Sequence, residues 1–320
     1  MSNTEKIPEK IPEKNKVCNQ MVVTLLPEPA PGTAAELLPP IPPPIPEKIP
    51  DIVFIVPYRD RAPQKKVFEC VMPTLLEDYN YKIFFIHQKD KRAFNRGAMK
   101  NIGFLYVKRK WPEAYKKMTL VFHDIDFISY YKDQFNYMAT KGIVKHFFGY
   151  TWTLGGIVSM NAGDFERING FPNIWTWGLE DNILQKRCKK AGYGVDRSKF
   201  LTGGADEDKL ITLWHGWDRL INKQILPKFQ TKSTFDGFGR IENIQYNVEN
   251  IKENVDIVNV THFLTGEREQ IAIRDAQQLN SRFNQNFDKP QKKISTQKQY
   301  PHHNIFPSLG GTKRRGMKFT

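Results

Sequence analysis

The sequence predicts an α/β protein built on an open, mostly parallel sheet that is flanked by helices. Short apolar runs alternate with segments of helical period between residues 51 and 127, an order that is typical of parallel sheets. Each apolar run also leads directly into polar residues. Because the ligands of such sheets bind outside the carboxyl ends of the strands, we expect these polar residues to form one site.

The predicted elements follow one another in a regular order. The stretch DIVFIVPYRDR, from residue 51, holds a continuous apolar run that Pro57 ends, which is typical of a buried parallel strand. The next helix, strand, helix and strand are predicted at residues 67–79, 81–88, 98–110 and 118–124. The pattern weakens from Gly192 onward, and residues 216–240 are predicted to form a long lid loop.

Both ends of the chain differ in composition from this domain, which we assign to residues 51–285. Residues 1–50 hold twelve of the 21 prolines and repeat Ile-Pro-Glu-Lys, so we expect a disordered, polyproline-like leader. Residues 286–320 form a basic tail. The net charge of +14 comes without any base-reading motif, and we therefore expect no specific nucleic-acid binding.

Cysteine usage and hydropathy bear on where the protein works. None of the three cysteines has the spacing of a zinc site, and three cannot build a disulfide framework, so a reducing compartment is expected. No apolar run approaches the ~20 residues of a membrane helix, and no signal-peptide layout is present. These observations predict a soluble, cytoplasmic protein without a transmembrane segment.

Two carboxylates, Asp124 and Asp126, stand at the predicted end of the strand at 118–124. In an extended chain residues i and i+2 point the same way, so both could address one cation. Aspartate and histidine suit manganese or magnesium bridging a diphosphate, and His215 is a candidate further ligand. The alternatives are an acidic turn and a histidine that only packs.

Three arginines and two aromatic residues are candidates for binding a nucleotide or a sugar. Arg59, Arg61 and Arg96 follow predicted strands and could form bidentate hydrogen bonds to phosphate, with ordinary surface charge as the alternative. Phe94 and Trp177 could stack on a base or a pyranose ring, with core packing as the alternative.

The stretch WTWGLEDN, residues 175–182, places Glu180 and Asp181 side by side at a predicted helix start. Carboxylates at a helix start interact favourably with the helix dipole, and this capping role explains the two acids alone. It does not explain the preceding tryptophans and glycine. A general base beside a platform for sugar stacking explains all of them.

Five segments resemble the beta-1,4-galactosyltransferase family in their order and spacing, over about residues 51–220. They are FIVPYRDR (54–61), AFNRGAMKNIGF (93–104), VFHDIDF (121–127), LGGIVSM (154–160) and INGFPNIWTWGLEDN (168–182). The resemblance implies a GT-A nucleotide-sugar transferase fold with a Rossmann-like sheet. It also implies a UDP-sugar donor, Mn²⁺ (with Mg²⁺ possible) and inversion of the anomeric centre.

The resemblance further implies a role for each matched residue. The uridine and phosphate pocket would be formed by Pro57, Arg59, Arg61, Phe94 and Arg96. The remaining donor contacts would be Asp124, with Asp126 as the manganese ligand, and the backbone floor at Gly155 and Gly156. The residues at the sugars would be the mobile Trp177, the sugar-binding acid Glu180 and the catalytic base Asp181.

Several positions depart from the family pattern. Asn182 replaces a third acid, which points to altered acceptor contacts, and Thr153 replaces the usual tyrosine, which leaves room for an N-acetyl group on the donor. Thr212 and Leu213, upstream of His215, are not the usual further metal ligands. The membrane anchor and the disulfides of secretory-pathway members are absent, as expected of a cytosolic, bacterial or viral version.

The first functional hypothesis is a metal-dependent, inverting glycosyltransferase. It would transfer galactose or N-acetylgalactosamine from a UDP-sugar to a sugar hydroxyl of a glycan or glycoprotein acceptor. One alternative is a sugar-binding or structural protein of the same fold whose site has decayed. The other is a metal-dependent phosphohydrolase that uses Asp124 and Asp126.

Overall fold

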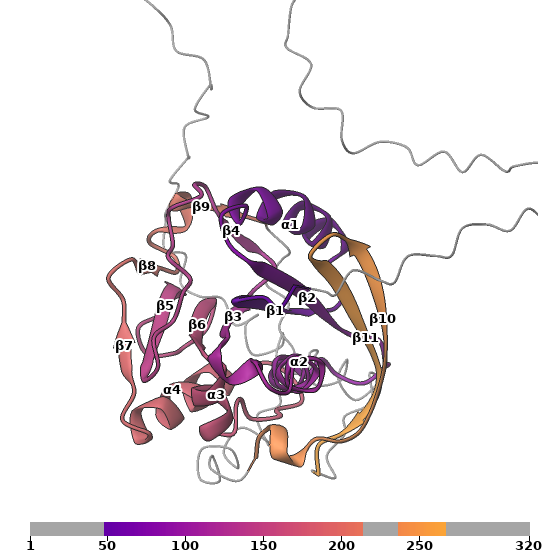
Figure 1. Ribbon diagram of the computed structural model, residues 1–320. Helices are drawn as coiled ribbons and strands as arrows, with labels where there is room; N and C mark the ends of the chain where they lie inside the picture. The colour runs from indigo at the N-terminus through magenta and orange to yellow at the C-terminus, as the bar shows by residue number, and fades with distance from the viewer. Residues whose placement is uncertain (1–47, 214–235, 267–320) are drawn as a thin grey trace, which may run out of the picture. The chain divides into compact units, whose positions relative to one another are not determined.

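A nine-stranded sheet forms the centre of the computed structural model, which describes residues 48–213 and 236–266 (Figure 1). The strands of this sheet are β1 (Ile52–Tyr58), β2 (Tyr81–Gln88), β3 (Thr119–His123), β5 (Ile143–Gly149), β6 (Ile157–Asn161), β7 (Gly194–Asp196), β8 (Leu201–Thr202), β10 (Glu242–Lys252) and β11 (Val255–Leu264). A separate pair is formed by β4 (Phe127–Ser129) and β9 (Leu210–Thr212). The helices are α1 (Ala62–Leu75), α2 (Arg96–Lys110), α3 (Ala162–Arg167) and α4 (Glu180–Lys190).

The strand order is β10-β11-β2-β1-β3-β6-β5-β7, and β8 pairs with β5. Strands β11, β2, β1 and β3 run parallel to one another, as do β5 and its partners β7 and β8. Strand β6 is antiparallel to both of its neighbours, and β10 is antiparallel to β11. The predicted α/β sheet is therefore confirmed, as a mixed sheet in which parallel pairs predominate.

The central strand β1 shows why an uninterrupted apolar run is needed here. Its residues Ile52 to Val56 are fully buried, and successive side chains point to opposite faces of the sheet. Val53 and Ile55 pack in the core layer that contains α2, whereas Phe54 lies in the layer that contains α1. Figure 1 shows these two helices on opposite faces of the sheet.

Two helices begin earlier than their hydrophobic period suggested. Helix α1 starts at Ala62, five residues before the predicted start, with Pro63 in a first turn where its missing N–H costs nothing. Helix α2 starts at Arg96 because the side chain of Asn95 caps it, accepting a hydrogen bond of 2.9 Å from the backbone N–H of Ala98. The capping residue thus places the candidate Arg96 in the first turn of a helix.

The strands β10 and β11 were not predicted from the sequence. Most residues of β10 are exposed, because it is an edge strand, and the alternation of Ile244, Tyr246 and Val248 with polar residues is the signal that could have identified it. Strand β11 is inserted beside β2, and Val255, Val258, Val260 and Phe263 of this strand are fully buried. The core of the domain therefore includes residues beyond the predicted lid.

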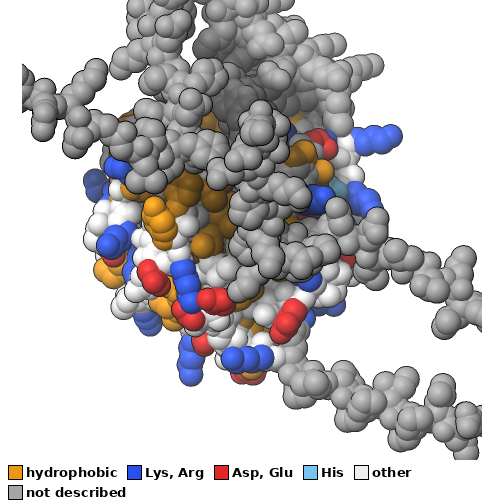
Figure 2. Space-filling model, turned by 90° about the horizontal axis from the view of Figure 1, so that it is seen from above, with side chains coloured by type: hydrophobic (Ala, Val, Ile, Leu, Met, Phe, Trp, Pro, Cys, Tyr) orange, Lys and Arg blue, Asp and Glu red, His pale blue; other side chains and the backbone are white. Residues whose placement is uncertain are grey.

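Residues 1–47 of the predicted leader, the basic tail and residues 216–235 of the predicted lid lie outside the described residues. The described end of the lid prediction, residues 236–240, includes the buried Asp236 and a short 3-10 helix at Phe238–Arg240. Within the described ranges, no helix is long and apolar enough to cross a membrane. On the face shown in Figure 2, Lys and Arg are interspersed with Asp and Glu rather than gathered into one patch.

Candidate active site

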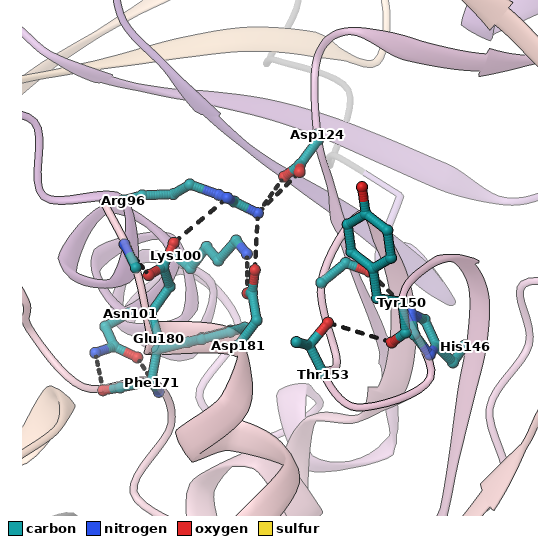
Figure 3. A network of polar contacts seen from close by, with 12 residues as sticks. Arg96, Lys100, Asn101, Asp124, His146, Tyr150, Thr153, Phe171, Glu180 and Asp181 are labelled. Carbon is teal, nitrogen blue, oxygen red and sulfur yellow. Dashed lines mark hydrogen bonds and ion pairs between the residues drawn. The ribbon is translucent and has the colours of Figure 1, made fainter. Parts of the chain in front are cut away.

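Five charged side chains, from α2, α4 and the loop after β3, meet beyond the carboxyl end of β3 (Figure 3). Arg96 lies at the centre of this cluster, in the first turn of α2. Its Nη2 donates to both carboxylate oxygens of Asp124, at 2.8 Å each. Longer contacts, of 3.4 and 3.3 Å, join the same guanidinium to Glu180 and Asp181 at the start of α4.

The carboxylates of this cluster keep Arg96 charged, whereas burial disfavours the ionised forms of Asp124 and Glu180. Burial alone would lower the pKa of Arg96, but Asp124, Asp181 and Glu180 together raise it, so the guanidinium stays charged. Burial and the neighbouring Asp181 raise the pKa of Glu180, which is only 3% exposed. The cluster is therefore a shielded, charged site of the kind that is common where catalysis occurs.

The backbone before α4 is sharply turned. Thr176, Gly178 and Leu179 all have positive φ angles, of 97°, 121° and 66°, which is unusual for threonine and leucine. The Gly178 N–H donates to Glu180 Oε2 at 3.0 Å, so Glu180 also stabilises the turn that precedes its helix. Strained backbone of this kind clusters at functional sites, and here it aims both carboxylates at Arg96.

The glycine pair at 155 and 156 lies directly against this cluster. A Cβ on Gly155 would stand 2.9 Å from Cγ of Asp181 and closer still to its Oδ2, so only glycine allows this approach. Gly156 has a φ of +74°, and its carbonyl accepts a hydrogen bond of 2.9 Å from the Asp124 N–H. The pair thus brings the backbone beside both acids.

His146 and Arg197 support this glycine loop, and the sequence did not single out either of them. Arg197 Nε donates to Nδ1 of His146 at 3.1 Å, so the other ring nitrogen, Nε2, carries the proton and donates to the Gly155 carbonyl at 3.0 Å. Burial, with a smaller contribution from Arg197, lowers the pKa of His146 to about 4. The histidine is therefore a neutral structural donor at ordinary pH.

Lys100 is the second buried cation of the cluster, and it was also missed. Its Nζ lies 3.1 Å from Oδ1 of Asp181, and the residue is 2% exposed. Lys100 follows Arg96 by four positions on α2, which places both side chains on one face of the helix. That spacing, inside the segment AFNRGAMKN, is the signal that could have identified it.

The two tryptophans of the segment WTWGLEDN have different environments. Trp175 is 2% exposed and stacks on Phe263 of β11, with ring centroids 5.2 Å apart and an angle of 11° between the planes. Trp177 is 46% exposed. Core packing therefore explains Trp175, whereas the exposed Trp177 is available to contact a ligand.

A stacked pair of aromatic residues is exposed next to the start of α4. The rings of Tyr150 and Trp152 are 4.8 Å apart and nearly parallel, and both are largely exposed. Asn182 donates to the backbone carbonyl of Trp152 at 3.2 Å, and Thr153 to that of Tyr150 at 3.3 Å. The two family departures, Asn182 and Thr153, thus hold the loop that presents this pair.

The remaining predicted donor residues lie on the strand-end loops. Pro57 pairs with Ile86 near the end of β1, and Phe94 packs against the core while its carbonyl accepts from the Thr176 N–H at 3.2 Å. Arg59 donates to the backbone carbonyl of Arg92. Arg61 donates to the carbonyl of Asp60 at 2.9 Å. The structure thus connects these loops to one another through backbone contacts.

The expectation that Asp124 and Asp126 continue an extended strand is wrong. Strand β3 ends at His123, and residues 125 and 126 form a turn that leads into β4. His215 lies outside the described residues, within which no group of three His, Cys, Asp or Glu side chains could hold a metal ion. The carboxylates at this turn have the oxygen chemistry that Mn²⁺ and Mg²⁺ prefer, and a bound diphosphate could supply further ligands.

Family models match the two halves of this site. The model described as the N-terminal region of glycosyl transferase group 7 matches residues 42–140, which include Arg96 and Asp124. The model described as the N-terminal domain of galactosyltransferase matches residues 143–208, which include Gly155 and Asp181. Together the two models match more than half of the chain.

Relatives with similar sequences include beta-1,4-galactosyltransferases. The chain is 29% identical over 238 residues to human beta-1,4-galactosyltransferase 5, an alignment that covers 69% of this chain and 57% of the relative. It is 31% identical over 162 residues to beta-1,4-galactosyltransferase 5 of Danio rerio, covering 46% of this chain and 40% of the relative. The chain thus spans less than two thirds of the length of these relatives.

Solved structures show the same fold. The catalytic domain of Drosophila beta1,4galactosyltransferase 7 in complex with xylobiose matches with a TM-score of 0.54 and 24% identity, over 67% of this chain and 94% of that chain. A mutant of that protein, in complex with manganese, UDP-Gal and xylobiose, matches with a TM-score of 0.55 and 23% identity over the same shares. The GT-A fold is therefore confirmed, and the chain belongs to the glycosyl transferase group 7 family.

Proposed function

We propose that the protein is an inverting, metal-dependent glycosyltransferase that transfers galactose or N-acetylgalactosamine from a UDP-sugar to a sugar hydroxyl. One observation carries this proposal: Asp181, whose side chain is only 16% exposed, lies against Gly155 at the start of α4, where Arg96 and Lys100 hold it. A carboxylate that is fixed in this way suits a general base. The family membership and a structural neighbour complexed with manganese and UDP-Gal support the donor class.

The proposed reaction is a single displacement at the anomeric carbon. The acceptor oxygen forms a bond to that carbon while the bond to the diphosphate oxygen breaks, and UDP leaves. Asp181 takes the proton of the acceptor hydroxyl as the new bond forms. Arg96 and Lys100 keep the base oriented during this step.

The remaining residues have donor and acceptor roles in this proposal. Asp126, with His215, would hold the metal ion, which when bound neutralises charge on the diphosphate. The arginines at 59, 61 and 96 would contact the phosphates, and Trp177 would cover the sugars. The aromatic pair at 150 and 152 would lie beside the acceptor.

The choice between galactose and N-acetylgalactosamine is assigned to position 153. Thr153 has a shorter side chain than tyrosine, and it bonds back to the Tyr150 carbonyl of its own loop, just before the glycine pair. A larger residue there would fill the space that an N-acetyl group needs. Thr153→Tyr should therefore lower the rate with the N-acetylated donor relative to galactose.

The test is a transfer assay with UDP-galactose and UDP-N-acetylgalactosamine, Mn²⁺ and a panel of simple glycoside acceptors. Chelation of the metal should abolish transfer, and added Mn²⁺ should restore it. Asp181→Asn should reduce kcat by about 10² to 10⁴-fold, since that is the usual contribution of positioned proton transfer, while donor binding persists. Turnover near the wild-type rate in this variant would refute the role of Asp181.

The alternatives have less support. The matched family and the relatives are glycosyltransferases, so no comparison favours a phosphohydrolase. A decayed sugar-binding protein would have no need to keep a part-buried carboxylate between two cations. Absence of transfer with every donor, together with tight sugar binding, would favour the decayed form.

A further inference from the structure

Lys100 occupies an unusual position for a lysine. Its side chain is 2% exposed, and its ammonium group lies 4.4 Å from the centre of the Phe171 ring. Lysine is almost never fully buried unless it is paired, and the partner here is Oδ1 of Asp181, at 3.1 Å. The carboxylate of Asp181 is therefore the ion-pair partner of this buried ammonium group.

Lys100 is also the nearest cation to Asp181. Arg96 Nη2 is 3.3 Å from Oδ2, but the shorter contacts of that guanidinium go to Asp124, at 2.8 Å. Glu180 stands beside Asp181 on α4, and His146 faces it from β5 as a neutral group. The three carboxylates of the cluster thus share two cations. Arg96 binds mainly Asp124, and Lys100 pairs with Asp181.

We propose that Lys100 is a positioning residue for the transfer reaction. Its ammonium group holds Oδ1 of Asp181 and keeps the carboxylate ionised, so that Oδ2 is the oxygen that receives the proton of the acceptor hydroxyl. This inference rests on the proposed function, because it assigns a partner to the proposed base. It goes beyond that function by naming what keeps the base charged next to Glu180.

The electrostatics give the inference a measurable consequence. Burial would raise the pKa of Asp181, but the charges of Arg96 and Lys100 outweigh burial and hold it below the usual value. If Lys100 loses its charge, the adjacent acids Glu180 and Asp181 repel each other with less compensation. One of the two should then keep a proton to higher pH, and the base is lost below that pH.

The test is the pH profile of kcat/KM for Lys100→Met, measured in the transfer assay with UDP-galactose and Mn²⁺. The acid limb of the profile should move upward by about one to three pH units, the usual effect of a close opposite charge. Donor affinity should stay within a few-fold of wild type. Lys108→Met is the matched control, because Lys108 is on the same helix but pairs with Glu166 on the surface, and its profile should not move.

Two further measurements make the result decisive. Lys100→Gln keeps a hydrogen-bond donor without the charge, and it should move the acid limb in the same direction. The ¹³C titration of the Asp181 carboxyl, assigned by its loss in Asp181→Asn, should show the same shift without turnover. An unmoved acid limb in either folded variant overturns the inference, as does unfolding of both while Asp181→Asn remains folded. Failure of the wild-type protein to transfer any sugar would instead refute the proposed function.

Discussion

Replacing Gly155 with alanine tests whether the base is positioned by the glycine loop. The φ angle at Gly155 is outside the left-handed region, so alanine adds no backbone strain, and its only effect is the added methyl group. That methyl carbon would lie 2.9 Å from Cγ of Asp181, whereas carbon atoms in contact prefer roughly 3.5 to 4.0 Å. The carboxylate must therefore retreat by about 1 Å, a distance given by the difference between these contacts.

This retreat moves Asp181 relative to the cations that hold it. Its contacts of 3.1 Å to Lys100 and 3.3 Å to Arg96 cannot both survive a shift of that size. A misplacement of about 1 Å can cost roughly 100-fold in rate, so kcat/KM of Gly155→Ala should fall by about two orders of magnitude. Donor affinity, measured by calorimetry, should change little.

Gly239→Ala is the matched control for this substitution. Its Cβ would make an ordinary contact of 3.4 Å with Asn169, and its φ angle is also outside the left-handed region. Transfer by this variant should remain within a few-fold of wild type. If Gly155→Ala transfers as fast as the control while Asp181→Asn is inactive, contact with residue 155 does not position the base.

Two further predictions concern the tryptophans and the buried histidine. Trp177→Ala should slow transfer without lowering the thermal midpoint, because Trp177 is 46% exposed, whereas Trp175→Ala should cost about 3 to 5 kcal/mol in a denaturant titration because it empties a packed site. An equal loss of stability in both variants would contradict this division. The lowered pKa of His146, about 4 against 6.5 when unfolded, means that only the unfolded state takes up a proton between these pH values. Stability should thus fall as the pH decreases from 6.5 to 4, by up to about 1.4 kcal/mol per pH unit from this group, and His146→Gln should show a shallower urea-midpoint dependence.

The sequence predicted the parallel centre of the fold because burial on both faces demands continuous apolar runs. The strand at 81–88 has the predicted bounds, and the strand at 119–123 is one residue shorter than predicted at each end. The first strand does not end at Pro57 as predicted but continues to Tyr58. Strand β10 has no such continuous run, because an edge strand is covered on one side at most; its apolar residues Ile244 and Tyr246 alternate with polar ones and pack against the core. Its pairing partner is β11, which follows it in the sequence.

Prediction of the site depended on how far apart its partners are in the sequence. Arg96, Asp124 and Asp181, which the structure brings together, each stand in a local pattern, next to a strand or a helix start. Lys100 and His146 were missed because they contact residues 81 and 9 positions away, and the four-residue spacing of Lys100 from Arg96 does not by itself name its partner. The turn at Asp126 was missed because β3 ends at His123, where its pairing with β6 ends, and the local sequence does not show the end of that pairing.

The stacking of Trp175 on Phe263 ties the start of α4 to the far end of the described chain. Trp175 Nε1 also donates to Thr265 at 3.2 Å, and Arg92 lies over both rings, so the turn before α4 packs on residues 88 and 90 positions later. The family models end at residue 208 and leave this support out. A fragment cut to the matched region would keep every proposed catalytic side chain, yet it would lack the strand beside β2 and the ring that packs on Trp175. During synthesis, this support can therefore form only after β11 has been made.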